Sequence, residues 1–84
     1  MDNEVKIKKK SIAEIFWQNV LNELEDRGET PPMLEGFLNK RSYVSNSRKQ
    51  GSLPKAPLIE KIAEYLCVDC YVLFIDEEND TYPL

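Results

Sequence analysis

Residues Asn39 to Pro54 read NKRSYVSNSRKQGSLP. Together with Lys55 this stretch holds five of the chain's eleven basic residues, and no acid occurs between Glu35 and Glu60. The rest of the chain is acidic, so charge alone sets this stretch apart. Its local pattern also decides which fold the chain can adopt.

A short helix is predicted inside the stretch, from Tyr43 to Gln50. Ser42 suits the N-cap position before it, and Gly51 suits the left-handed position after it. Val44 is its one strongly apolar residue. We therefore expect this helix to be held by one side and to offer most of its surface to solvent.

The turn before this helix and the loop after it also follow from residue type. Asn39 tolerates a left-handed conformation, which predicts a turn over residues 39–41. Prolines at positions 54 and 57 predict a loop. The side chain of Leu53 is expected to pack into the core from that loop.

Four further helices are predicted around this one. Ser11 and Glu14 form a capping box that starts the first, which ends before Gly28. Thr30, followed by proline, starts the second, with Gly36 in its middle where another helix is expected to pass close. Helical spacing predicts the remaining two over 57–66 and 70–75, the last preferred over a strand because no partner strand is evident. The predicted fold is all-α, a compact bundle of five short helices.

Apolar residues at helical spacing give the expected core of this bundle. The set is Ile12, Ile15, Phe16, Trp17, Val20, Leu21 and Leu24 from the first helix, Met33, Leu34, Phe37 and Leu38 from the second, and Leu58, Ile59, Ile62, Ala63 and Leu66 from the fourth.

The 84 residues fit one domain, with a net charge of −4 that is unevenly distributed. Residues 1–35 carry −3, residues 36–59 carry +5 and residues 60–84 carry −6. We expect residues 1–10 to be a flexible basic arm, 11–76 the folded domain and 77–84 an acidic C-terminal tail. No apolar run is long enough for a membrane span and no signal peptide is evident, which predicts a cytoplasmic protein.

The chain has no histidine, and its two cysteines, Cys67 and Cys70, have no second pair to complete a zinc site. Histidine-based catalysis is thereby excluded, and no phosphate-binding glycine loop or carboxylate pair is evident. We expect no enzyme, metal, cofactor or small-molecule substrate. A redox role for the cysteines, or a zinc shared across a dimer, stays open.

The motifs after residue 43 resemble those of the Cro/C1-type helix-turn-helix family of phage repressors. The run VSNSRKQGSLP (residues 44–54) is similar to the end of a recognition helix with its glycine and S-[IL]-P exit. The pattern LIxxIAxxLxVDxxxL (residues 58–73) is similar to the family's fourth and fifth helices, with Cys67 where the family usually has glycine. Residues 38–42 read LNKRS in place of the usual Gly-Val/Ile-Ser turn. The resemblance implies a sequence-specific, DNA-binding transcriptional regulator that reads the major groove, with double-stranded DNA as its partner.

Residue types and the family pattern then assign expected DNA contacts. Asn and Gln bind adenine bidentately, and basic side chains bind phosphate. The expected base-reading residues are Arg41, Ser42, Tyr43, Ser45, Asn46 and Gln50. The expected phosphate contacts are Thr30, Lys40, Arg48, Lys49, Ser52 and Lys55, with Thr30 and Ser52 implied by the resemblance alone.

A homodimer on two half-sites is expected, with an interface formed by Tyr71, Val72, Phe74 and Ile75. The alternative is a protein-binding module of the same fold, antirepressor-like or antitoxin-like, that does not itself bind DNA. Acidic ends and the unusual turn favour that alternative, whereas the acid-free window favours DNA.

Overall fold

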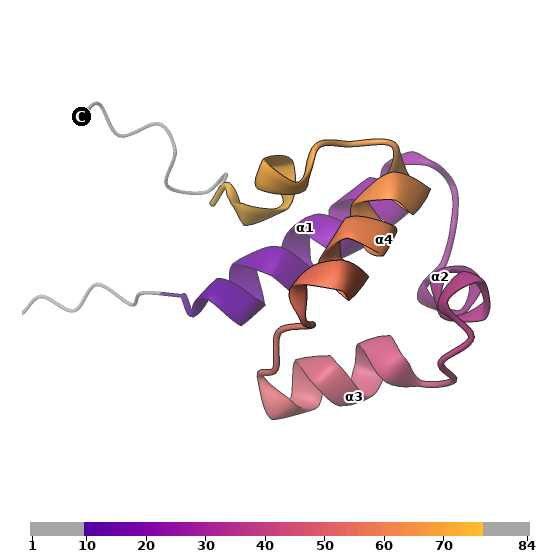
Figure 1. The fold of residues 1–84 in the computed structure, drawn as a ribbon, viewed down its shortest axis with the longest axis horizontal. Coiled ribbons are helices and arrows are strands. Elements are labelled where there is room, and N and C mark those ends of the chain that lie inside the picture. The colour runs from indigo at the N-terminus through magenta and orange to yellow at the C-terminus, as the bar shows by residue number, and fades with distance from the viewer. Residues whose placement is uncertain (1–9, 77–84) are drawn as a thin grey trace, which may run out of the picture.

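The computed structural model describes residues 10–76, which form four α-helices followed by a 3₁₀-helix, with no strand in this range. The helices are α1 (Ile12–Asp26), α2 (Pro31–Leu38), α3 (Tyr43–Gln50), α4 (Ala56–Leu66) and η1 (Cys70–Phe74). α1 and α4 run through the centre, and α3 lies along one edge, on the side opposite η1 (Figure 1). The all-α prediction is confirmed, with the fifth helix being of the 3₁₀ type. The predicted arm (mainly residues 1–9) and acidic tail (77–84) lie outside the described residues.

The predicted capping box starts α1. The Glu14 N–H donates to Ser11 Oγ at 3.1 Å, and the Ser11 N–H donates to Glu14 Oε1 at 2.9 Å. Two of the helix's unpaired N-terminal donors are thereby satisfied reciprocally. This local signal is fully readable in the sequence.

All four α-helices end in the same way, on a residue with left-handed backbone. Gly28, Asn39, Gly51 and Cys67 have φ of 72°, 59°, 67° and 60°. After α2, for example, the Lys40 N–H donates to the Glu35 carbonyl and the Asn39 N–H to the Gly36 carbonyl. This pair of bonds is a Schellman motif, which satisfies carbonyls that the helix leaves unpaired. Glycine and asparagine suit it, but cysteine carries a steric cost there.

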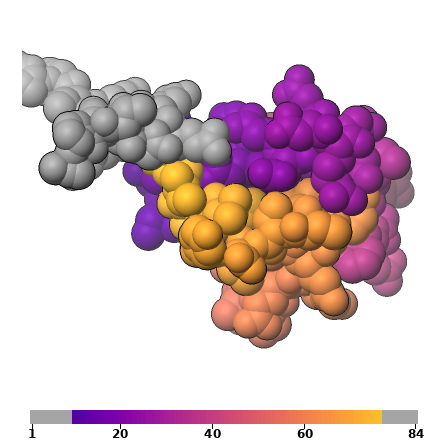
Figure 2. Space-filling view, turned by 90° about the horizontal axis from the view of Figure 1, so that it is seen from above, coloured from indigo at the N-terminus to yellow at the C-terminus, as the bar shows by residue number. Residues whose placement is uncertain are grey.

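The core lies where α1, α4 and η1 meet. Phe16, Val20 and Ile62 are fully buried, and Leu73 of η1 is buried with them. η1 packs against α1 and against α4, the helix that precedes it in the chain (Figure 2). The buried Asn19 fixes this arrangement, because its Nδ2 donates to the Leu73 carbonyl at 3.0 Å and the Ile75 carbonyl at 2.7 Å.

Several predicted core residues are in fact exposed. Ile12 is 61% exposed, and Met33 and Phe37 are about half exposed, because the short helices each bury only one narrow side. Leu53 is also exposed, and the buried residue of that loop is Pro54. The expectation for Gly36 was wrong too, since a Cβ placed there would meet nothing within 4 Å.

None of the helices between residues 10 and 76 is long and apolar enough to cross a membrane.

Candidate functional site

α3 is attached to the rest of the domain by one side, as the sequence predicted. Val44 is buried, and so is Ser47, about one turn further along the helix. Ser45, Asn46, Lys49 and Gln50 are all exposed. A helix of eight residues is about 12 Å long, so this outward face offers roughly two turns of polar side chains.

The start of α3 is capped by a residue that the sequence analysis missed. Ser42 has φ of 58° and makes no side-chain cap bond, because a serine N-cap needs extended backbone. Instead, Glu35 Oε2 accepts a hydrogen bond from the Val44 N–H at 2.9 Å. A side chain of α2 therefore holds the start of α3 across the four-residue turn.

The end of α3 is held by Trp17 of α1. The Trp17 indole N–H donates to the Ser52 carbonyl at 2.8 Å, and the Ser52 N–H donates to the Ser47 carbonyl. The Ser52 hydroxyl donates to Gln50 Oε1 at 3.3 Å. Ser52 and Gln50, two of the expected DNA contacts, are thus hydrogen-bonded to each other.

Five basic residues surround α3, and we call them the basic surface: Lys40, Arg41, Arg48, Lys49 and Lys55. All five are exposed, and none pairs with a carboxylate among residues 10–76. Within the part of the chain that the structure describes, no carboxylate therefore neutralises these five charges.

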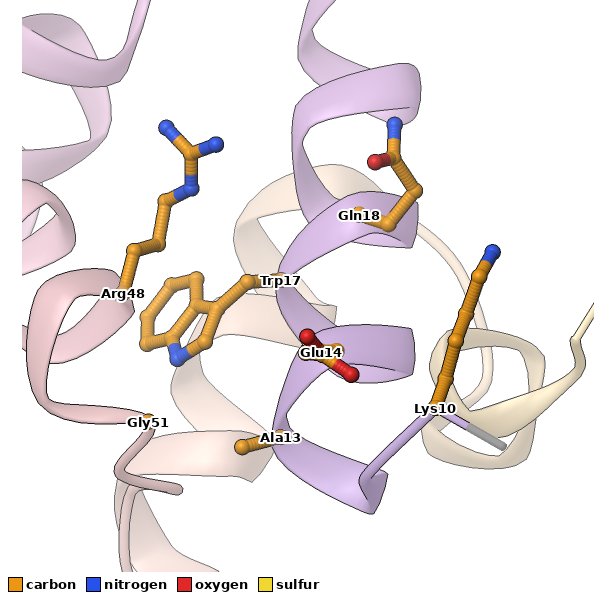
Figure 3. A pocket seen from close by; sticks show the side chains of 7 residues that line it. All are labelled: Lys10, Ala13, Glu14, Trp17, Gln18, Arg48 and Gly51. Atoms are coloured by element: carbon orange, nitrogen blue, oxygen red, sulfur yellow. The ribbon is translucent and has the colours of Figure 1, made fainter. Parts of the chain in front are cut away.

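Arg48 lies at the edge of the basic surface. It lines a cavity of about 290 Å³ between α3 and α1, and it extends beside the Trp17 ring (Figure 3). Lys10 and Glu14 line the α1 side of the same cavity. Arg48, an expected phosphate contact, therefore flanks the outward face of α3.

Tyr43 was an expected base-reading residue like Asn46, but it is half-buried. Its ring lies 6.0 Å from that of Trp17, and the Lys40 ammonium lies 5.7 Å from its centroid. The first helical position turns its side chain toward α1, so Tyr43 borders the outward face without being part of it.

Thr30 is distant from the other expected contacts along α2. It precedes α2 with extended backbone, whereas Lys40 and Arg41 follow the other end of the same helix. Eight helical residues separate these ends by about 12 Å. The site therefore consists of a compact group around α3, with Thr30 apart from it.

The four expected dimer-interface residues differ in their surroundings. Tyr71 is 66% exposed, whereas Val72 and Ile75 are half-buried. The Phe74 ring packs 5.3 Å from that of Phe16, so Phe74 belongs largely to the core. Tyr71 is the member most available to a second subunit.

Between residues 10 and 76, no three His, Cys, Asp or Glu side chains gather in a way that suits a metal ion. Cys67 and Cys70 are both free thiols.

Comparisons with protein-family models, with curated proteins and with solved structures found no match to this chain.

Proposed function

We propose that this chain is a sequence-specific DNA-binding regulator of the helix-turn-helix type, similar in fold to the phage-repressor domains that its motifs resemble. The observation that carries the proposal is the presentation of α3. One exposed polar helix face is bordered by five basic residues that no described carboxylate neutralises. A protein that reads the major groove combines phosphate contacts, which position it, with side chains that reach the base edges.

In this proposal, positioning and reading fall to different side chains. Lys40, Lys49 and Lys55 neutralise phosphates, which supplies salt-dependent affinity. Asn46 is exposed in the middle of α3, where its amide can pair with an adenine edge. Arg41, in the turn before α3, is suited to guanine or to phosphate.

Binding to random-sequence duplex DNA at several salt concentrations tests the proposal. Wild-type affinity should fall steeply with salt, with each phosphate contact contributing about −0.9 to the slope of log K against log salt. Replacing Arg41 and Lys49 together with alanine should abolish binding. Arg27→Gln removes one positive charge outside the basic surface and should leave binding intact, with circular dichroism showing that loss of its hydrogen bond to the Leu66 carbonyl leaves the domain folded. Equal binding by the wild type and the double variant would rule the proposal out.

Specificity needs a second measurement. Duplexes selected from a random pool define the preferred site, and Asn46→Ala should then lose about 1–3 kcal/mol of discrimination at one base pair. Its affinity for unrelated duplexes should change little, because Asn46 carries no charge.

We further propose that two chains associate through Tyr71 and its neighbours, which would place two α3 helices on successive half-sites. Sedimentation should show a dimer for the wild type, and a dimer that dissociates more readily for Tyr71→Ser. A monomer at high micromolar concentration would remove this part of the proposal.

A second candidate function is protein binding by the same fold, in the manner of an antirepressor or antitoxin. An exposed apolar patch favours it: Met33 and Phe37 are each about half exposed, and the Phe37 ring packs 4.8 Å from that of Tyr65. Absence of any salt-dependent DNA binding, together with loss of a protein partner on Phe37→Ser, would favour this candidate over DNA binding.

A further inference from the structure

A groove with lysines on its rim lies between the start of α3, the α3–α4 loop and the start of α4. Its volume is about 630 Å³. We call it the lysine groove, and its lining residues used below are Lys40, Tyr43, Leu53, Lys55, Leu58 and Lys61.

The floor of the lysine groove is apolar. Leu53 is 39% exposed in it, and Tyr43 and Leu58 are half-buried along its sides. The prolines at 54 and 57 complete this floor. An exposed leucine beside an aromatic ring suits an occupant that carries apolar side chains of its own.

The rim of the lysine groove is positively charged. Lys40, Lys55 and Lys61 come from three different segments, and all are exposed. No acid is found among the described residues that line the groove. None of these lysines forms an ion pair within residues 10–76. The occupant should therefore be acidic as well as apolar.

Residues 77–84 of this chain, EENDTYPL, have this combination. Glu77, Glu78 and Asp80 supply three negative charges against the three lysines, and no base offsets them. Tyr82 and Leu84 follow with apolar side chains. We propose that the lysine groove binds this segment of the same chain.

The length of the segment sets how far it reaches from its start after Asp76, which lies 3.7 Å from the Lys10 ammonium. Eight extended residues span up to about 28 Å, and the first four, which carry the three acids, span up to about 14 Å. The carboxylates therefore have to meet the lysines within this shorter reach, whereas Tyr82 and Leu84 extend further along the groove.

A consequence rests on the proposed DNA binding. Lys40 and Lys55 are expected phosphate contacts, so the bound segment would compete with DNA for them. The groove itself can be tested without DNA, which separates failure of this inference from failure of the proposed function.

The test is NMR spectroscopy of the full chain. Replacing Glu77 and Glu78 with glutamine and Asp80 with asparagine should shift the resonances of Leu53, Leu58 and the Tyr43 ring. In the reciprocal variant, Lys55→Gln with Lys61→Gln, the Tyr82 ring resonances should shift. Lys49→Gln, which removes a lysine outside the groove, should leave Tyr82 unchanged.

Salt and dilution complete the test. Raising salt from about 0.1 M to about 1 M shortens the Debye length from about 10 Å to about 3 Å and should reproduce the shifts of the acid-neutralised variant. Dilution within a concentration range over which sedimentation gives one oligomeric state should have no effect on the groove resonances, because site and segment belong to one molecule. Unchanged groove resonances in the acid-neutralised variant, or shifts that depend on protein concentration within that range, would overturn the inference.

Discussion

The Glu35 carboxylate accepts a hydrogen bond from the Val44 N–H at 2.9 Å, so a side chain of α2 caps α3. The first N–H groups of a helix have no partner within it, and they carry partial positive charge. The Glu35 carboxylate therefore pairs one of these N–H groups and also interacts favourably with the dipole of α3. Because the bond joins two helices, it also fixes the angle at which α3 is presented.

Removing this cap should destabilise the domain. Glu35→Ala leaves the Val44 N–H unpaired in a partly buried position, and we expect a loss of about 1–2 kcal/mol in the free energy of unfolding. Glu25→Ala, at an exposed carboxylate of α1, is the matched control and should change it by less than about 0.5 kcal/mol. Urea denaturation followed by Trp17 fluorescence measures both, and equal losses would contradict the assigned cap.

The helices and their ends were predictable because their signals are local. The Ser11–Glu14 capping box and the left-handed Gly51 each depend on residues within one turn. Burial was less predictable, since periodicity identifies an apolar stripe but not how much of it a neighbour covers. Ile12 lies on the stripe of α1 yet is 61% exposed.

Asn19 should be important for holding η1 in place. Asn19→Ala leaves the carbonyls of Leu73 and Ile75 without their donor, and we expect a loss of about 2 kcal/mol in the free energy of unfolding. Hydrogen exchange should accelerate first in residues 70–76. Asn22→Ala serves as control, because Asn22 is exposed and its side chain accepts, among residues 10–76, a hydrogen bond only from Gln18. Matching behaviour of the two variants would show that the Asn19 bonds contribute little.

The candidate site was predictable in its composition but not in its supports. Exposure of Asn46 and of the basic surface follows from local charge and from Val44 being the one strongly apolar residue of the helix. Glu35, which caps α3, acts across a turn, and the partners of Asn19 lie 54 and 56 positions away. No periodicity reports such contacts, although an asparagine on an apolar helix face signals that a buried partner exists.

Cys67 should be replaceable by glycine with a gain in stability. Its φ of 60° is strained for a residue with a Cβ, by about 1–2 kcal/mol, and glycine's greater freedom in the unfolded chain offsets part of this. We expect Cys67→Gly to raise the free energy of unfolding by about 0.5–1 kcal/mol. Cys67→Ala removes the thiol but keeps the Cβ, so it should give no such gain. Thermal denaturation distinguishes the two, and a gain of equal size in the alanine variant would assign the effect to the thiol.

Tyr65 should make stability depend on pH in the alkaline range. Its hydroxyl donates to Glu29 Oε1 at 2.6 Å, and this bond, followed by burial and the Glu29 charge, raises the pKa of Tyr65, while Arg27 opposes the shift. Because the folded state favours the neutral phenol, this stabilisation is complete below the unfolded pKa of about 10 and is lost as pH rises through the higher folded pKa. The free energy of unfolding of the wild type should therefore fall more between pH 8 and 11 than that of Tyr65→Phe. The stability of Tyr71→Phe, a variant at an exposed ring, should change with pH as that of the wild type does. The absorbance difference between the wild type and Tyr65→Phe should report a phenol that titrates above the ordinary tyrosine value. A Tyr65 phenol that titrates at the ordinary tyrosine value would mean that the Glu29 bond does not persist in solution.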